Sequence, residues 1–388
     1  MAARFSNQIR TGSSIYTCEV TPSLETLDWR GFLARPPLPS PPPKALETLA
    51  RNPILITGGG GSIGAAIALK LRTIAPKIVL LEASEGQLFA LQSAQSESTE
   101  TINQSNVSFV LGSVTDAALL DEIFSIHSPR LVFHAAAFKH VPLMEEQPLA
   151  AIANNIFGTA TLVRAASAHG AHVVLLSTDK AVEPASVMGA SKRVAELIVL
   201  AAGGTVLRLG NVLASRDSVA ELFARQISAG APLTITDPAA RRYFLTIEEA
   251  VNLLLAAAVM ESPALLVPDL PAPQYIADLA KYLAHALAPD REVPIKFTHP
   301  RPGDKESEQL WSSTESCRPS KMTGLLSIDS PVLSKPKLQS KLVQLRAALD
   351  ARDTSAALEC LLALVPDYTP SSIVLARGSE AASQVHHE

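Results

Sequence analysis

The feature that most constrains the fold is an alternation of short apolar runs with helical segments between residues 54 and 209. Each run is long enough for one strand and is apolar almost throughout, not only at every second residue. Such strands are typical of parallel sheets that carry helices on both faces. The sequence therefore predicts an α/β fold with a doubly wound parallel sheet. The expected strands are residues 54–57, 78–81, 107–111, 131–134, 173–176 and 206–209.

The part before the sheet, residues 1–50, lacks sustained periodicity. Its proline-rich run at 36–43 must be extended or polyproline-like, because proline fixes φ and removes the N–H donor. We interpret this part as an arm or linker, with docking along a partner protein as the alternative. Leu27, Trp29 and Phe32 are apolar side chains that can pin the arm to the body.

The remainder of the chain divides into a main domain and an extension. Residues 51–320 are expected to hold the sheet and, from about residue 210, a smaller lobe that covers a substrate. Residues 321–388 are expected to form a helical extension over 336–368, followed by a disordered tail. No internal repeat is seen in the sequence.

Composition excludes several classes of function. A net charge of −4 and a pI near 6.2 argue against nucleic acid as a partner. No run reaches the ~18 apolar residues that a membrane span needs, and no apolar signal core follows Met1. The three cysteines are far apart and offer no metal-ligand spacing, so no metal site is expected. We therefore expect a cytoplasmic protein with free thiols.

A glycine-rich turn follows the first expected strand and opens a helix. Gly58, Gly61 and Gly64 allow a tight turn and a close approach of the backbone to a pyrophosphate. Ser62 and Ile63 then begin a helix whose N-terminus faces that negative charge. In this context the turn predicts dinucleotide binding; a purely structural turn is the alternative.

Glu82 ends the second expected strand, where a ribose-binding acid belongs. Its carboxylate would accept hydrogen bonds from the adenosine ribose and would repel a 2′-phosphate. The sequence therefore favours NAD over NADP as cofactor. The alternative for Glu82 is a solvated loop acid.

Ser177-Thr178-Asp179-Lys180 follows the fifth expected strand. A hydroxyl, a carboxylate and an amine thus meet at a strand's carboxyl end, the edge where open α/β sheets bind ligands. Asp179 and Lys180 offer an acid and a base within one short loop. The alternative is a surface ion pair at the end of a strand.

Several blocks in order resemble one known family. They are FHAAAFKHVPLMEE (133–146), NIFGT (155–159), STDKA (177–181), LGNVL (209–213), RYF (242–244) and RPGDK (301–305). With the glycine spacing, they resemble the CapD-like polysaccharide-biosynthesis proteins. These are nucleotide-sugar 4,6-dehydratases of the extended short-chain dehydrogenase/reductase superfamily, which combine a Rossmann-type sheet with a smaller C-terminal substrate lobe. The resemblance covers about residues 54–310. Many relatives carry transmembrane helices before this domain; this chain resembles the soluble form.

The resemblance implies a reaction on UDP-N-acetylglucosamine or a similar sugar, and NAD as the cofactor that holds a hydride while water is lost. Asp179 would protonate the leaving C6 hydroxyl, and Lys180 would remove the C5 proton. Thr178 would hydrogen-bond the C4 oxygen, and Lys192 would hold the nicotinamide ribose. Lys180 must be neutral to act as a base, which requires burial or a nearby positive charge.

Met188 stands four residues before Lys192, where the superfamily places a tyrosine base. Methionine cannot exchange a proton, so a catalytically inactive binding protein is one interpretation. The membrane-bound branch of the family is similar to this chain here, with Met-Gly-Ala-x-Lys at the same position. This similarity favours an active enzyme.

The resemblance also implies further contacts. The expected cofactor contacts, besides the glycine turn, are Glu82, Ser84, Ser113, Val114, Ala135, Ala136, Ala137, Asn155 and Lys192. The expected substrate contacts are Lys139, Asn211, Arg216, Arg242 and Arg301, with a surface salt bridge as the alternative for each arginine. Ser113 replaces an aspartate that relatives use near adenine, and Asp217 replaces a glycine beside the sugar pocket.

Two other functions stay open. A nucleotide-sugar 4-epimerase or ketoreductase would need no Asp179–Lys180 pair, because neither reaction removes the C5 proton. A non-catalytic NAD- and UDP-sugar-binding protein would account for Met188, Ser113 and Asp217. A homo-oligomer is expected in each case.

Overall fold

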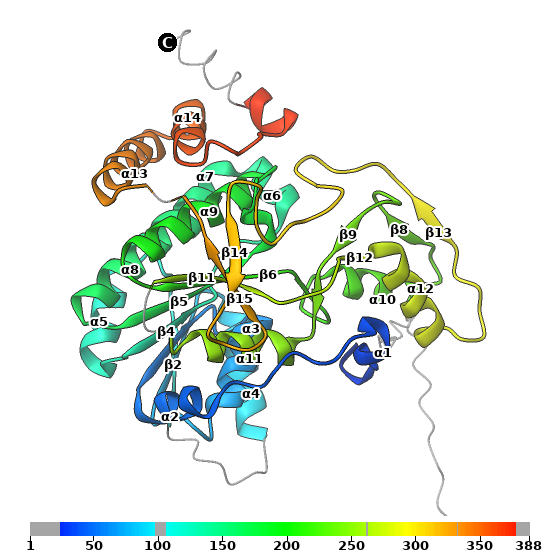
Figure 1. Cartoon of the computed structure of the whole chain (residues 1–388), viewed down its shortest axis with the longest axis horizontal. Helices are drawn as coiled ribbons and strands as arrows, with labels where there is room; N and C mark the ends of the chain where they lie inside the picture. Colours follow the sequence, from blue (N-terminus) through cyan, green and yellow to red (C-terminus); the bar gives the residue numbers. More distant parts are fainter. Residues whose placement is uncertain (1–23, 98–105, 261–262, 332, 378–388) are drawn as a thin grey trace, which may run out of the picture.

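The computed structural model describes residues 24–97, 106–260, 263–331 and 333–377. These residues form a central nine-stranded sheet in the order β14-β15-β11-β6-β5-β4-β1-β2-β3 (Figure 1). Neighbouring strands from β11 to β3 are parallel, whereas β15 pairs antiparallel with β11 and β14. The predicted parallel sheet is confirmed. Its strands are β1 (Ile54–Thr57), β2 (Ile78–Glu82), β3 (Val107–Leu111), β4 (Leu131–His134), β5 (His172–Thr178), β6 (Thr205–Leu209), β11 (Ala264–Pro268), β14 (Ser316–Pro319) and β15 (Leu325–Asp329).

Helices cover both faces of this sheet because successive strand residues point to opposite sides. Ile54 and Ile56 face one helical layer, and Leu55 faces the other. The first layer comprises α2 (Pro43–Arg51), α3 (Ser62–Leu71), α4 (Glu85–Glu97) and α11 (Ile247–Ala257). The second comprises α5 (Ala117–His127), α6 (Val141–Glu146), α7 (Pro148–Ala151), the π-helical η3 (Ile152–Gly158), α8 (Thr159–Ala168) and α9 (Val187–Ala201). In the described part of the chain, no helix is both long and apolar enough to cross a membrane.

The smaller lobe is built from two separate excursions of the chain, at residues 211–245 and 274–297. Between them, α11 and β11 return to the sheet. The lobe contains β7 (Asn211–Val212), α10 (Val219–Ser228), β8 (Leu233–Ile235), β9 (Arg241–Arg242), β10 (Phe244–Leu245), β12 (Gln274–Tyr275), α12 (Ile276–Leu287) and β13 (Ile295–Phe297). Phe223, Leu279 and Leu283 form its buried centre.

The N-terminal arm contacts this lobe and contains helices that the sequence did not predict. They are η1 (Leu24–Thr26), α1 (Trp29–Leu33) and α2. The Phe32 ring lies 5.5 Å from that of Phe244 and 5.4 Å from that of Tyr282. The Nη1 atom of Arg35 lies 2.6 Å from Oε1 of Glu249, in a buried ion pair. Figure 1 shows α1 beside α12. Residues 1–23 of the predicted arm lie outside the described residues.

The C-terminal part differs from the expected helical extension in two respects. Residues 325–329 form a strand of the central sheet before α13 (Lys335–Asp350) and α14 (Thr354–Leu364) begin. The expected disorder from residue 369 is also wrong for the stretch up to residue 377. Its Val374 is fully buried, and the hydroxyl of Ser371 donates to Oε2 of Glu145 at 2.5 Å. Residues 378–388 of the predicted tail lie outside the described residues.

Candidate functional site

A tight glycine turn joins β1 to α3 at the carboxyl edge of the sheet. Gly58 has φ +68°, and a Cβ atom there would lie 2.7 Å from the backbone nitrogen of Ala136. A Cβ atom on Gly64 would collide with the carbonyl oxygen of Gly58. Both positions therefore require glycine, and the turn forms a cradle of bare backbone before the positive end of α3. The helix begins at Ser62 and Ile63, with Gly61 as its N-cap.

Glu82 ends β2 and turns its carboxylate toward this cradle. Its Oε2 atom accepts the backbone N–H of Gly60 at 2.9 Å, and its Oε1 atom accepts that of Ser84 at 2.9 Å. Each oxygen retains a second lone pair. The carboxylate therefore keeps hydrogen-bond acceptor capacity beside the cradle.

Ser113 and Val114 follow β3, the neighbour of β2. The Ser113 hydroxyl lies 2.9 Å from that of Thr115 and accepts the Thr115 backbone N–H at 3.2 Å. The side chain of Val114 is buried. Ser113 thus organises a local turn at the edge of the sheet.

The loop after β4, which contains Ala135, Ala136 and Ala137, is held by Asn155. The amide of Asn155 accepts the backbone N–H of Phe138 at 2.8 Å and donates to the carbonyl of Phe138 at 3.0 Å. It also donates to the Ser191 hydroxyl on α9 at 3.0 Å. Asn155 lies in η3, and π-helical segments are frequent at functional sites. It therefore fixes this loop relative to α9.

His134 is a packing residue in a buried hydrogen-bond chain. Its Nδ1 atom lies 2.7 Å from the Thr57 hydroxyl, and its Nε2 atom lies 2.9 Å from the Thr159 hydroxyl. The Thr159 hydroxyl donates to the carbonyl of Asn155, so Nε2 carries the proton and donates to Thr159. Burial, aided by the charge of Lys192, lowers the pKa of His134 to about 3 and keeps its ring neutral.

Thr178, Asp179 and Lys180 meet at the carboxyl end of β5, as the sequence indicates. The Thr178 hydroxyl donates to Oδ1 of Asp179 at 2.9 Å, and Nζ of Lys180 lies 3.0 Å from the same oxygen. Asp179 is fully buried, and its Oδ2 atom has no hydrogen-bond partner. The side chain of Lys180 remains 24% exposed. The pair is therefore not a surface ion pair, and it offers one free buried oxygen.

The structure does not provide the neutral Lys180 that sequence reasoning required. Burial alone would lower the pKa of Lys180, but the charges of Asp179 and Glu308 outweigh it and raise that pKa. Burial also raises the pKa of Asp179, against the effect of the Lys180 ammonium. Both members of the pair thus hold a proton more tightly than the free amino acids do.

Glu308 belongs to the site but was missed by the sequence analysis. Its Oε1 atom lies 3.6 Å from Nζ of Lys180, and its Oε2 atom lies 3.0 Å from Nζ of Lys305. The side chain is 3% exposed. A carboxylate three residues after Lys305 in a polar segment gives no local signal of burial.

Among the described residues, no cluster of three or more His, Cys, Asp or Glu side chains is suited to a metal ion.

Lys192 and Met188 lie on α9, on the inner side of the site. Nζ of Lys192 donates to the carbonyl of Leu176 at 2.7 Å. Burial, opposed by the charge of Glu196, lowers the pKa of Lys192 to about 8. Met188 is 3% exposed and packs in the core beneath the sheet edge. Lys192 therefore releases its proton more readily than a free lysine but remains mainly charged at neutral pH, while Met188 is a buried packing residue.

Of the expected substrate residues, Arg216 contacts the glycine turn instead of the Asp179 loop, and Lys139 contacts Arg216. Nη1 of Arg216 donates to the carbonyl of Gly60 at 2.8 Å, and its backbone N–H donates to the Ser62 hydroxyl at 2.9 Å. Nζ of Lys139 donates to the carbonyl of Arg216 at 2.5 Å. Two positive charges therefore lie over the cradle, beside Asp217, whose carboxylate lies 3.6 Å from Nε2 of His140.

The other three expected substrate residues are dispersed. Oδ1 of Asn211 lies 3.5 Å from Nζ of Lys180, inside the site. Arg242 donates to the carbonyls of Lys305 at 2.9 Å and Glu306 at 3.0 Å. Arg301 is 58% exposed and pairs with Asp304 at 3.1 Å, which matches the surface salt bridge left open for it.

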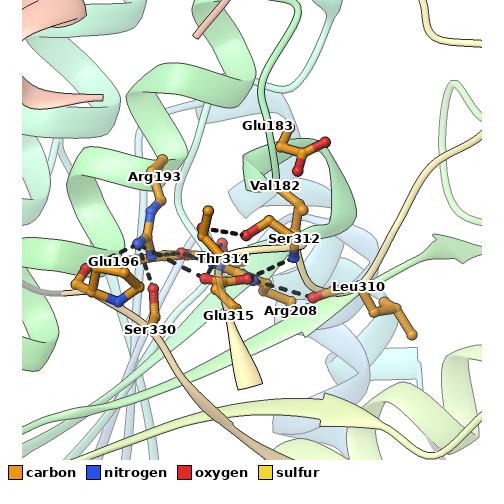
Figure 2. Close-up of polar contacts among 12 residues, drawn as sticks. Val182, Glu183, Arg193, Glu196, Arg208, Leu310, Ser312, Thr314, Glu315 and Ser330 are labelled. Atoms are coloured by element: carbon orange, nitrogen blue, oxygen red, sulfur yellow. Dashed lines mark hydrogen bonds and ion pairs between the residues drawn. The ribbon is translucent and has the colours of Figure 1, made fainter. Parts of the chain in front are cut away.

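A second buried charge cluster lies under the site, and Figure 2 shows it: Arg208 lies between Glu196 and Glu315. The Arg208 guanidinium makes five hydrogen bonds of 2.8–3.1 Å, to both carboxylates and to the carbonyl of Leu310. Glu196 also accepts from Arg193 at 2.9 Å and from the Ser177 hydroxyl at 2.6 Å. These contacts join β6, α9 and the segment before β14 beneath the Thr178–Lys180 loop.

Comparisons with known proteins assign the chain to a family. A family model described as polysaccharide biosynthesis protein matches residues 54–329. The capsular polysaccharide biosynthesis protein CapD of Staphylococcus aureus is 37% identical over 304 residues, 76% of this chain and 50% of that protein. A UDP-glucose 4-epimerase of Rickettsia rickettsii is 36% identical over 282 residues, 68% of this chain and 78% of that protein.

Among solved structures, that of Pen from Bacillus thuringiensis superposes with a TM-score of 0.67 at 25% identity, covering 76% of this chain and 99% of Pen. The chain spans about half the length of CapD. The resemblance to CapD-like proteins is confirmed, and so is the expected fold. On the match over residues 54–329, this chain belongs to the polysaccharide biosynthesis protein family.

Proposed function

We propose that the chain is an NAD-dependent nucleotide-sugar 4,6-dehydratase that acts on a UDP-N-acetylglucosamine-like sugar. The observation that carries the proposal is the buried Asp179–Lys180 pair, with Thr178 on the same carboxylate oxygen. An acid and a base side by side are what the removal of water from adjacent carbons requires. Their position at the carboxyl end of β5 supports a role in ligand chemistry.

The cradle fits a dinucleotide. Gly58 and Gly64 leave room for a pyrophosphate before α3, and Glu82 presents a carboxylate for the adenosine ribose. Lys192 and Asn155 would hold the nicotinamide end, where α9 approaches the loop after β4. In this position NAD would supply a reversible hydride acceptor for the sugar C4 carbon.

The side chains of the site would divide the remaining chemistry. Thr178 would orient the C4 hydroxyl of the sugar. Asp179, whose pKa is raised by burial, would carry a proton to the leaving C6 hydroxyl. Lys180 would take the C5 proton, once it has lost its own. Lys139 and Arg216 would neutralise phosphate charge over the cradle.

A nucleotide-sugar 4-epimerase is the second candidate, and it is supported by the identity to a Rickettsia protein named UDP-glucose 4-epimerase. An epimerase needs proton exchange at C4 alone. In an epimerase, the buried Asp179 oxygen and the Lys180 amine would take no part in the reaction. Met188 does not separate the two candidates, because both begin with removal of the C4 hydroxyl proton.

The test is to incubate the purified protein with NAD and a panel of UDP-sugars and to follow products by mass spectrometry. We expect loss of one water from a UDP-N-acetylhexosamine. Asp179→Asn and Lys180→Ala should abolish this loss, whereas Asp121→Asn on the surface of α5 should not. Interconversion of C4 epimers without release of water would replace the dehydratase proposal by the epimerase.

Cofactor choice has its own measurement. Because Glu82 would repel a 2′-phosphate, calorimetry should show tighter binding of NAD(H) than of NADP(H). Equal affinities would remove Glu82 from the ribose role.

A further inference from the structure

Lys180 faces more negative charge than a single partner would supply. Its Nζ atom lies 3.0 Å from Oδ1 of Asp179, 3.6 Å from Oε1 of Glu308 and 3.5 Å from the amide oxygen of Asn211. The cation of Arg242 opposes these acceptors. The three acceptors come from three elements and converge on one amine.

Glu308 is held in this position by ion pairs with two lysines. Its second oxygen is engaged by Lys305, whose Nζ atom also donates to the carbonyl of Val182 at 2.8 Å. Two residues further on, the carbonyl of Leu310 accepts from Arg208 at 3.1 Å, and Ser312 and Glu315 continue the same buried network (Figure 2). The backbone that follows Glu308 is therefore anchored to Arg208 through the carbonyl of Leu310.

We propose that Glu308 is a positioning residue that keeps Lys180 as an ammonium in the resting protein, so that Lys180 becomes a neutral base only by passing a proton to Asp179. This inference deepens the proposed function and rests on it for the identity of the base. The effect of Glu308 on the protonation of Lys180 does not depend on which reaction the site performs.

The proton balance is simple. One proton leaves Nζ of Lys180 and arrives at Oδ1 of Asp179, 3.0 Å away, which leaves a neutral amine and a neutral carboxylic acid. No proton comes from or goes to solvent. In the resting pair, burial raises the pKa of Glu308, but the charges of Lys180, Lys305 and Arg242 outweigh it and hold that pKa below its usual range. Once Lys180 is neutral, the charges of Lys305 and Arg242 remain to keep Glu308 ionised. The same transfer thus prepares the base for C5 and the acid for the C6 hydroxyl.

The pH dependence of acylation at Lys180 tests the role of Glu308 directly. An amine reacts only when neutral, so competitive labelling with acetic anhydride, read by peptide mass spectrometry, gives the pKa of each lysine. Glu308→Gln removes a charge 3.6 Å from Nζ and should move the Lys180 midpoint down by about one unit or more. The midpoint of Lys192 in the same sample should stay in place and serves as an internal reference.

Matched variants complete the test. Glu306→Gln removes the same charge from an exposed position in the same segment and should leave the Lys180 midpoint unchanged. Lys305→Gln removes the cation that competes for Glu308 and should raise the midpoint. The inference is overturned if Glu308→Gln behaves like Glu306→Gln, or, should Glu308→Gln not fold, if Lys305→Gln fails to raise the midpoint.

The activity readout separates this inference from the proposed function. In Glu308→Gln, the alkaline limb of the pH profile for water loss should shift to lower pH together with the labelling midpoint. If the wild-type protein releases no water from any UDP-sugar, the proposed function fails, while the labelling midpoints still decide the role of Glu308.

Discussion

Two buried charge clusters lie close together in this molecule, and they differ in how completely their hydrogen bonds are satisfied. In the lower cluster, Arg208 uses all five of its N–H donors on Glu196, Glu315 and a carbonyl. In the upper cluster, Asp179 has an oxygen without a partner, and Lys180 is partly exposed. A saturated cluster has no capacity for another ligand, whereas an unsatisfied buried oxygen does.

The difference has an energetic side. Burying a polar atom without a hydrogen bond costs about 1–3 kcal/mol of folding free energy. The unpaired oxygen of Asp179 therefore destabilises the protein, and a bound hydroxyl would remove this penalty. Arg208 and its two carboxylates carry no such penalty. They stabilise the packing of β6, α9 and the segment before β14, which supports the upper cluster. The following predictions test this division, beginning with the largest effect.

The largest effect is expected for turnover on removal of Lys180. Lys180→Met should lower the rate of water loss by about a hundred-fold to ten-thousand-fold, the usual effect of losing a general base. Stability should change little, because Asp179, already raised in pKa, can take a proton and become neutral. Mass spectrometry of the product and urea unfolding measure the two effects; a large loss of stability with activity retained would reverse the assigned roles.

The lower cluster should show the opposite response. Arg208→Met leaves two buried carboxylates unpaired and should lower the free energy of unfolding by about 3–5 kcal/mol. The matched control is Arg318→Met on β14, whose ion pair with Asp329 is exposed and should contribute nothing measurable. Urea unfolding of both variants checks the contrast, and equal midpoints would contradict it.

The lower cluster should also control acid stability. Burial would raise the pKa of Glu315, but hydrogen bonds and charge from Arg208 lower it from 4.5 to about 2. A carboxylate with a lowered pKa in the folded state stabilises above its unfolded pKa, and this stability is lost as pH falls from about 4.5 to about 2. Glu315→Gln should therefore flatten the pH dependence of urea unfolding in that window; an unchanged slope would exclude this account.

The smallest effect is expected at Met188. Met188→Leu conserves volume in the core and should cost less than about 1.5 kcal/mol. Turnover should stay within a few-fold of wild type, since only shape is required there. Collapse of turnover in a folded variant would show that the thioether takes part in the chemistry.

The sheet was predictable because its parallel strands are continuous apolar runs. Strands β1, β3 and β4 begin and end at the predicted residues. Strand β14 was not predictable, since all four of its residues are exposed and it lies at the edge of the sheet. The helices of the arm were missed because their apolar residues pack on elements far away in the sequence: α1 packs on the lobe and α2 packs with α11. The Arg35–Glu249 separation of 214 illustrates the distance along the chain.

Those parts of the candidate site that lie within one loop were predictable from the sequence. Thr178, Asp179 and Lys180 are adjacent in sequence, and so are the glycines of the cradle. Glu308 was missed because tertiary folding alone brings it to Lys180. Arg208 offered a usable signal: a charged residue inside an apolar strand must find buried carboxylates, and Glu196 on the neighbouring helix was available.

The contact between Arg35 and Glu249 also has a consequence for the order of assembly on the ribosome. The arm is made well before its docking surface on α11, β10 and α12, because Arg35 and Glu249 are separated by 214 residues. Until then, Trp29 and Phe32 have no apolar surface on which to pack. The arm is therefore the last of the early segments to settle, and its docking marks a nascent chain whose lobe is complete.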